Sequence, residues 1–546
     1  MELTEQGIKD RLSWEKGGYA LPKYDRALIR QNTKETPFWI HFGAGNLFRA
    51  FHANVVEKLL NSHLLTRGII LAEGFDYEII ERINHPHDDL TILATLKANG
   101  SLEKTVIGSI MESLILDTNY QQDYTRLKEI FCKESLQMAT FTITEKGYQL
   151  INASGSYLPA VTNDLKNGPT KPESYLGKVT SLLYVRYLSN EKPIAMISMD
   201  NCSHNGSKLQ EAIVTYAKAW CDQGLTKPGF LDYIMDDQKV SFPWTMIDKI
   251  TPRPDETVKE QLVNDGVLHL EPIITSKHTY IAPYVNSEEC EYLVIEDTFP
   301  NGRPPLEQGG LFFTTRDTVE KAEKMKVCTC LNPLHTSLAI FGCLLGYQRI
   351  FKEMEDPDLR QLAEQLGYHE GLPVVTDPGI LNPREFLDTV LQSRIPNPFL
   401  PDTPQRIATD TSQKLAIRFG ETIKAYAASP TLSVSDLKLI PFIFAGWLRY
   451  LMAIDDQGQS FELSPDPLLK TICPRLQSFS LGMGTEIEPI LRPILENATI
   501  FGVNLYEVQM APLVCKHFSQ MIEEPAAVRK TLHKTVSLKI EAPHCS

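Results

Sequence analysis

Short apolar runs alternate with amphipathic segments through the first half of the chain. Four nearly continuous runs predict buried strands: Phe38–Phe42, Gly68–Ala72, Met138–Thr144 and Ile194–Ser198. After the first run, apolar residues recur at the spacing of one helical face: Phe48, Phe51, Val55 and Leu59. Strands that alternate with helices predict an α/β fold, with a mostly parallel, doubly wound sheet covered on both faces.

The pattern changes after the turn-rich segment Phe299–Pro305. Strand signals fade there, and amphipathic helical patterns such as Leu334–Tyr347 and Ile440–Ile454 take over. We therefore expect two domains, a dinucleotide-binding domain over residues 1–299 and a mostly α-helical substrate and catalytic domain over residues 300–546. The end of the chain, Thr531–Ser546, is read either as a loosely held tail or as a final strand over Thr535–Ile540.

Composition narrows the class of protein. The 546 residues are 42% hydrophobic and 22% charged, with a net charge of −14. These are globular values, and an acidic, mixed surface argues against nucleic acid as the main partner. Met1–Trp14 lacks the apolar core of a signal peptide. The apolar stretch Leu437–Ile454 is predicted to be a buried helix rather than a membrane span, because Pro441 and Arg449 interrupt it. With ten scattered cysteines interpreted as reduced thiols, we expect a cytoplasmic protein without a membrane partner.

A glycine turn joins the first strand to its helix. Gly43 and Gly45 stand where the dinucleotide-binding fingerprint places glycines, between a strand and a helix. Glycines allow a tight turn, and the free N–H groups of the helix N-terminus can bind a pyrophosphate. Phe48 occupies the position of the third glycine, so the turn alone leaves nucleotide binding and a chance loop equally open.

An acidic residue follows the second strand. Glu73 can accept hydrogen bonds from the hydroxyls of an adenosine ribose, and its charge would repel a 2′-phosphate. This favours NAD over NADP. Asp76 competes for the same role, and Glu73 can also be a solvated loop residue.

The most informative segment runs from Lys326 to His335. Asn332 and His335 are three residues apart, so they share one face if a helix begins near Asn332. Oxidation of an alcohol needs a base for the hydroxyl proton and donors for the oxygen, and a buried lysine can be that base. Asn332 can equally be a helix N-cap before a proline, and His335 a core histidine. Cys328 and Cys330 with His335 make an incomplete zinc ligand set, so we expect no metal.

Two further polar clusters lie in apolar surroundings. Asn201 follows the strand that ends at Ser198, which is where ligands collect in an open α/β sheet. Asp248 stands beside a second apolar run. Asp200, in the first cluster, can also be a turn or capping residue.

These segments together resemble the polyol-specific long-chain dehydrogenases, the mannitol dehydrogenase family. The resemblance covers most of the chain, from about His41 to Tyr450. Its motifs, in order, are His41–Ala50, Thr144–Tyr148, Asp200-Asn201 with Asn205-Gly206, Asp248–Pro252, Glu296-Asp297 with Gly302–Pro304, Lys326 with Asn332–His335, Arg394 with Asn397-Pro398, and Trp447–Leu451. Each motif is modest alone, but eight in the same order are specific.

The resemblance implies a Rossmann-type N-terminal domain, a mostly helical C-terminal domain, an active site in the cleft between them, and catalysis without metal. Lys326 resembles the general base, and Asn332 and His335 the residues that hold the reacting oxygen. The substrate-side positions implied are Asn201, Asp248 and Arg394. The cofactor positions implied are Gly43, Gly45, Asn46, Phe48, Arg49, Glu73, Thr144 and Glu145.

One departure from the family concerns spacing. Lys326 and Asn332 are six residues apart, one more than is usual in the family. An extra residue within an α-helix would rotate the lysine by about 100°. We expect a loop or bulge before the helix to absorb it, with Lys324 as a less favoured substitute base.

The substrate is expected to be a small, open-chain sugar derivative. The preferred interpretation is an NAD-dependent oxidoreductase that reduces a fructuronate-like keto sugar acid to a mannonate-like acid. Arg394 or Arg406 would then bind the substrate carboxylate. A polyol 2-dehydrogenase acting on mannitol or arabinitol is the alternative within the family. A nucleotide-binding regulator without catalysis is the alternative outside it. The sequence does not indicate an oligomeric state.

Overall fold

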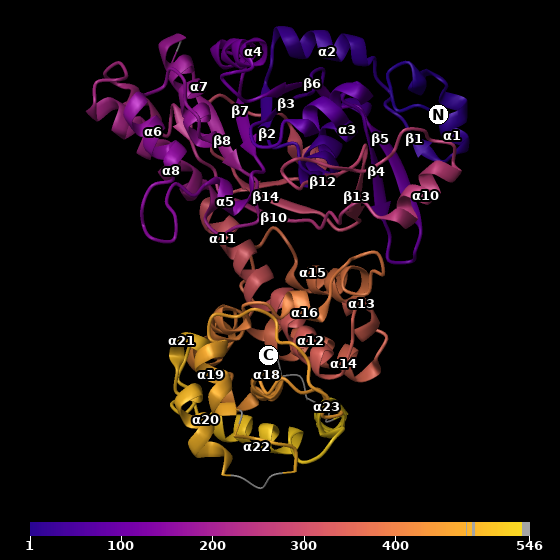
Figure 1. Cartoon of the computed structure of the whole chain (residues 1–546), viewed down its shortest axis with the longest axis vertical. Helices are drawn as coiled ribbons and strands as arrows, with labels where there is room; N and C mark the ends of the chain where they lie inside the picture. The colour runs from indigo at the N-terminus through magenta and orange to yellow at the C-terminus, as the bar shows by residue number, and fades with distance from the viewer. Residues whose placement is uncertain (190, 477, 483–485, 538–546) are drawn as a thin grey trace. The chain divides into compact units, whose positions relative to one another are not determined.

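The computed structural model describes residues 1–189, 191–476, 478–482 and 486–537. The chain forms two compact units (Figure 1). Unit 1 comprises Met1–Lys97 and Ser101–Val319, and unit 2 comprises Ala98–Gly100 and Glu320–Ser546. Unit 1 is α/β and unit 2 is helical, as the change of pattern along the sequence predicts.

A parallel six-stranded sheet organises unit 1. Its strand order is β6-β3-β2-β7-β8-β9, and every neighbouring pair is parallel. The strands are β2 (Trp39–Phe42), β3 (Ile69–Glu73), β6 (Ile110–Ile115), β7 (Met138–Phe141), β8 (Ile194–Ser198) and β9 (Val240–Ser241). The four strands predicted from apolar runs are therefore confirmed as β2, β3, β7 and β8.

Both faces of this sheet are buried, which explains why its strands read as continuous apolar runs. Along β2, Trp39 belongs to one apolar cluster, whereas Ile40 and Phe42 belong to another. The covering helices are α2 (Arg26–Glu35), α3 (Ala53–Asn61), α4 (Gln121–Cys132), α7 (Tyr175–Ser189), α8 (Asn205–Asp222) and α9 (Phe230–Met235). α2 and α3 contribute to the first cluster, and α4, α7, α8 and α9 to the second.

Smaller sheets complete unit 1. The order β1-β5-β4-β13 comprises β1 (Tyr19–Ala20), β5 (Leu102–Ile107), β4 (Thr91–Leu96) and β13 (Tyr284–Glu288). The order β10-β14-β15 comprises β10 (Thr245–Asp248), β14 (Tyr292–Glu296) and β15 (Phe312–Thr314), and β11 (Ile273–Ile274) pairs with β12 (Tyr280–Ile281). Because β15 pairs with β14, the chain stays in unit 1 past residue 300. The two units divide later than the predicted boundary, within α11 (Arg316–Lys324).

Unit 2 is built from helices. The main ones after α11 are α12 (Asn332–Leu344), α13 (Ile350–Glu353), α14 (Pro357–Gln365), α15 (Pro383–Thr389), α16 (Pro404–Ile407), α17 (Glu421–Ala428), α18 (Leu439–Tyr450), α19 (Leu469–Leu476), α20 (Ile487–Leu495), α21 (Ala498–Phe501), α22 (Ala511–Met521) and α23 (Ala527–Ser537). Every residue of α18 is buried, so the apolar stretch predicted as a core helix is confirmed.

The end of the described chain differs from its prediction. Residues 527–537 form helix α23, so a strand beginning at Thr535 is wrong. The helix forms because Val528, Leu532 and Val536 share one buried face, and it packs on α14 and α22. The rest of the predicted strand, from residue 538 on, lies outside the described residues.

Within the described chain, one continuous helix, Arg316–Leu344, is long and apolar enough to cross a membrane. In its most apolar window, 78% of the residues are buried inside the fold. This burial is what a core helix requires, and the window includes the start of α12.

A buried carboxyl group faces α12 from α13. Glu353 is fully buried, and among the described residues neither of its oxygens has a hydrogen-bond partner. It packs so closely on Gly342 that a side chain there would collide with it. Burial, together with the nearby charge of Asp356, raises the pKa of Glu353 well above its ordinary value. The folded protein therefore releases this proton at a higher pH than the unfolded chain does.

We expect Glu353→Gln to weaken the dependence of the unfolding free energy on pH. The unfolded chain releases the Glu353 proton near the ordinary glutamate pKa, whereas the folded chain keeps it. The parent protein therefore loses stability as the pH rises above that ordinary value, by at most about 1.4 kcal/mol per unit. Urea unfolding at about pH 5 and about pH 8 measures the loss. Glu355→Gln, at an exposed ion pair with Lys352, is the control. An unchanged pH dependence in Glu353→Gln would refute the assignment.

Candidate active site

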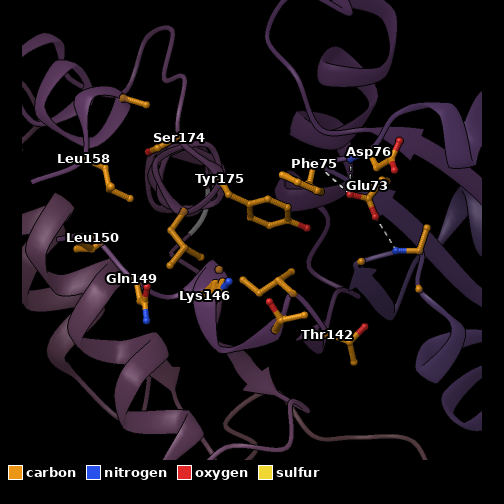
Figure 2. Close-up of a pocket in the computed structure, with 18 of the residues that line it drawn as sticks. Glu73, Phe75, Asp76, Thr142, Lys146, Gln149, Leu150, Leu158, Ser174 and Tyr175 are labelled. Carbon is orange, nitrogen blue, oxygen red and sulfur yellow. Dashed lines mark hydrogen bonds between the residues drawn. The ribbon is translucent and has the colours of Figure 1, made fainter. Parts of the chain in front are cut away.

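A cavity of about 560 Å³ opens in unit 1 at the carboxyl ends of β2, β3 and β7 (Figure 2). The strand register aligns these ends, since Phe42 pairs with both Ala72 and Phe141. The predicted cofactor residues that line the cavity are Gly43, Gly45, Glu73 and Thr144. Figure 2 shows Glu73 and Asp76 on one side of Tyr175, and Leu158 on the other. A cavity at this edge is the usual ligand position of an open parallel sheet.

Gly43 is required by the geometry of the turn. Its φ is +115°, a conformation that side chains rarely adopt. A Cβ atom at residue 43 would lie 2.3 Å from the carbonyl oxygen of Thr142. The turn can therefore pass close to the end of β7 only with glycine at this position.

Glu73 braces the glycine turn. Its Oε2 accepts the backbone N–H of Ala44 at 2.7 Å, and its Oε1 accepts those of Phe75 at 2.7 Å and Asp76 at 3.1 Å. Burial raises the pKa of Glu73, and these three donors oppose that rise. Because both oxygens are already used by the backbone, the geometry gives Glu73 a structural function beside the cofactor cavity.

Asp76 is better placed than Glu73 to bind a ribose. It is buried and lines the cavity, and its Oδ2 accepts the hydroxyl of Thr275 at 2.6 Å. Its Oδ1 is buried and has no hydrogen-bond partner among the described residues. A buried acceptor without a partner is costly unless a ligand supplies a donor. This observation favours Asp76 over Glu73 as the carboxylate available to a ligand in the cavity.

Three predicted cofactor residues, at the start of the helix after the turn, do not line the cavity. Phe48 is buried and stacks on His41, with ring centroids 4.1 Å apart. Arg49 is buried and donates to the carbonyl of Ala282 and to Oδ1 of Asn46, both at 2.8 Å. Asn46, Phe48 and Arg49 therefore fix the start of the helix that follows the turn.

In the turn after β7, too, some predicted cofactor residues line the cavity and others do not. Thr144 lines the cavity with Ile143 and Lys146, whereas Glu145 is exposed and pairs with Lys208 of α8. Glu145 is thus the fourth predicted cofactor residue that the structure places outside the cavity lining.

The predicted substrate-side residues of unit 1 follow strand ends. Asn201 is exposed just after β8, and Asp248 is the buried last residue of β10. Asn205 connects the two segments, since its Nδ2 donates to the carbonyl of Asp200 at 3.0 Å and to Oγ1 of Thr245 at 2.8 Å. An asparagine-glycine pair after a strand is the only sequence signal for this role, and it is not specific.

Lys326, Asn332 and His335 lie on one continuous helix of unit 2. Lys326 is buried, at 4% exposure, whereas Asn332 and His335 are half-buried at the start of α12. Between α11 and α12 the helix widens into a π-helical turn, Met325–Cys330. There the N–H of Leu331 donates to the carbonyl of Lys326 at 3.1 Å, five residues back. A π turn stores one additional residue inside a helix. The extra residue before Asn332 is thus absorbed in a bulge, but the expectation that the bulge and Lys326 precede the helix is wrong, because both lie within it.

Arg394 and His335 line the same small cavity of unit 2. Arg394 is buried at 1% exposure, and Asn397 and Asp402 complete the polar lining. Arg406, the other predicted carboxylate partner, forms an ion pair with Asp402 and is 65% exposed. Asp402 carried no recognisable signal in the sequence. The structure therefore brings Arg394, rather than Arg406, next to a predicted catalytic residue.

Among the described residues, no group of three His, Cys, Asp or Glu side chains is close enough to hold a metal ion. The nine described cysteines are free thiols. Burial raises the pKa of both Cys328 and Cys330 to about 11, so neither is a thiolate near neutral pH. Thiolates are the form that binds zinc.

A parallel sheet with a cavity over a glycine turn, followed by a helical unit with a buried lysine, defines a two-domain protein of the Rossmann dehydrogenase class. The comparison with protein families is more specific. Residues 38–308 match the mannitol dehydrogenase Rossmann domain, and residues 318–514 match the mannitol dehydrogenase C-terminal domain. The chain belongs to the mannitol dehydrogenase family. Helix α23 lies beyond the matched residues.

Relatives cover nearly the whole chain. It is 51% identical to the D-mannonate oxidoreductase of Thermotoga maritima over 98% of this chain and 99% of that protein. It is 29% identical to the mannitol 2-dehydrogenase of Neosartorya fischeri over 79% of this chain and 81% of the relative. The solved mannitol 2-dehydrogenase of Pseudomonas fluorescens has the same fold, with a TM-score of 0.68 at 23% identity, over 99% of this chain and 100% of that one.

Proposed function

We propose that this protein is an NAD(H)-dependent oxidoreductase that reduces a fructuronate-like keto sugar acid to a mannonate-like acid, and catalyses the reverse reaction. The observation that carries the proposal is 51% identity, over almost the full length of both chains, to a D-mannonate oxidoreductase. The mannitol 2-dehydrogenase of Neosartorya fischeri is much more distant, at 29% identity.

The cavity of unit 1 fits a dinucleotide. The turn at Gly43 leaves room for a pyrophosphate at the following helix N-terminus, and the unpartnered oxygen of Asp76 fits a ribose hydroxyl. The related Pseudomonas fluorescens enzyme was solved with NAD and D-mannitol. When bound, NADH supplies the hydride for the ketone carbon.

Lys326 supplies the proton in the reducing direction. Its ammonium Nζ–H bond breaks as the O–H bond of the product alcohol forms, which leaves a neutral amine. Asn332 and His335 donate hydrogen bonds to the oxygen as negative charge develops on it. In the oxidising direction the neutral amine takes the hydroxyl proton back.

The substrate carboxylate is assigned to Arg394. A buried guanidinium binds a carboxylate through paired hydrogen bonds, and Arg394 lines a cavity with His335. Arg406 is less suited because its side chain is 65% exposed and it does not line this cavity. The free thiols and the net charge of −14 support a cytoplasmic enzyme of small-molecule metabolism.

The test is the oxidation of NADH by the purified protein with fructuronate, tagaturonate and fructose. We expect turnover of a uronate with a kcat/KM at least tenfold above that of fructose. Turnover of fructose alone would replace the proposal with a polyol 2-dehydrogenase. Binding of NADH without turnover of any ketose would favour the non-catalytic regulator.

A further inference from the structure

The turn after β7 contains a strained residue. Thr144 has a φ of +63°, in the left-handed region that β-branched residues avoid. It lines the cofactor cavity together with Ile143 and Gly147. Non-glycine residues keep such a conformation only where their surroundings enforce it, and they cluster at functional sites.

One carboxylate holds this turn in place. Oδ1 of Asp200 accepts the backbone N–H of Thr144, and its Oδ2 accepts that of Ile143, both at 2.9 Å. The phenol of Tyr148 also donates to Oδ2, at 2.6 Å. Adjacent backbone N–H groups are thus bound by separate oxygens of one side chain, which fixes the peptide between them.

Asp200 is itself held from the other side. It is buried, at 7% exposure, and its carbonyl accepts Nδ2 of Asn205 at 3.0 Å. The phenol of Tyr148 lies 2.8 Å from Oγ of Ser198, the last residue of β8. The Asp200 carboxylate therefore connects the turn after β7 to the segment that follows β8 and restrains the turn there.

Asp200 is not among the residues that line the cavity, so its connection to a ligand of this cavity runs through the turn. Glycine would adopt this φ without strain, yet the chain has threonine. A threonine at this position therefore needs a restraint from its surroundings to keep its backbone conformation.

We propose that Asp200 is a positioning residue that holds Thr144 in the left-handed conformation and so shapes the cavity for the dinucleotide. The inference rests on the proposed function insofar as it takes NADH as the ligand of this cavity. It assigns Asp200 a role through Thr144 and not through contact with the substrate.

The experiment is a double-mutant cycle between Asp200→Asn and Thr144→Gly, read as the dissociation constant of NADH from its fluorescence. Asparagine keeps the size of the side chain but turns an N–H₂ group toward one backbone N–H. We expect Asp200→Asn alone to raise the dissociation constant at least tenfold. In the Thr144→Gly background the same change should raise it less than threefold, because glycine no longer needs the restraint. Equal increases in both backgrounds would overturn the inference.

A matched control comes from the same unit. Glu57 is also buried, and it accepts the phenol of Tyr24 at 2.6 Å and the backbone N–H of Gly108 at 2.8 Å, but it does not line the cavity. We expect Glu57→Gln to lower the thermal stability while NADH binding stays within twofold of the parent protein.

Hydrogen exchange separates this inference from the proposed function. Without any cofactor, Asp200→Asn should speed the exchange of the amide of Ile143 or Thr144, whichever loses its acceptor, at least tenfold, and Glu57→Gln should not. Unchanged exchange in Asp200→Asn would overturn the positioning role even if NADH binds. A parent protein that does not bind NADH would instead remove the proposed function, while faster exchange would still support the restraint of the turn.

Discussion

Replacing Lys326 with alanine should lower kcat by about a hundredfold to ten-thousandfold, the typical contribution of a positioned proton donor. The dissociation constant of NADH should change less than twofold, because the residues that line the cofactor cavity belong to unit 1 and Lys326 to unit 2. Steady-state kinetics with a uronate and a fluorescence titration with NADH measure the two effects separately.

Lys324 provides the control for this experiment. It lies on the same helix, but its side chain is 55% exposed and pairs with Glu320 at 2.9 Å. Lys324→Ala should retain nearly the full kcat of the parent protein. If Lys324→Ala lost activity and Lys326→Ala kept it, the general base would be Lys324 instead of Lys326.

The second large effect concerns the choice of cofactor. Asp76→Asn should raise the ratio of kcat/KM with NADPH to that with NADH by about tenfold to a hundredfold, since each factor of ten corresponds to about 1.4 kcal/mol. The substitution removes the charge that repels a 2′-phosphate, while an oxygen remains available for the hydroxyl of Thr275. Initial rates at several concentrations of each cofactor give the ratio.

Glu73→Gln distinguishes the two carboxylates. Because Glu73 accepts three backbone N–H groups, its replacement should weaken the binding of both cofactors alike and lower the thermal stability. If Glu73→Gln shifted the cofactor preference and Asp76→Asn did not, the ribose-binding role would belong to Glu73 instead of Asp76.

The sequence predicts the central sheet well because the burial of each strand is visible in that strand's own residues. Strands buried on both faces must be apolar throughout, and this identifies β2, β3, β7 and β8. The glycine turn was also predictable, since a strand, Gly43 and a helix occur in the required order. The same reasoning could not assign β15 to unit 1, because strand pairing is not local in sequence.

Side-chain roles at the candidate site were harder to predict. Glu73 and Asp76 look alike in the sequence, and only the backbone donors around them separate a structural carboxylate from one with an unused oxygen. Phe48 and Arg49 belong to a motif of the family, but the π-helical turn Phe48–His52 directs both into the core. Nor does residue spacing reveal that a helix can store an additional residue, as it does after Lys326.

The stored residue has a consequence for protein engineering. A helix with a π turn can lose one residue there and relax to the ordinary α-helical repeat, without a new loop. Such a deletion changes the direction of everything on one side of the turn relative to the other, by about 100° per residue. In this protein Lys326, the proposed proton donor, lies within the turn, and Asn332 and His335 follow it on the same helix. A deletion in this turn would therefore change the direction in which Lys326 points relative to Asn332 and His335.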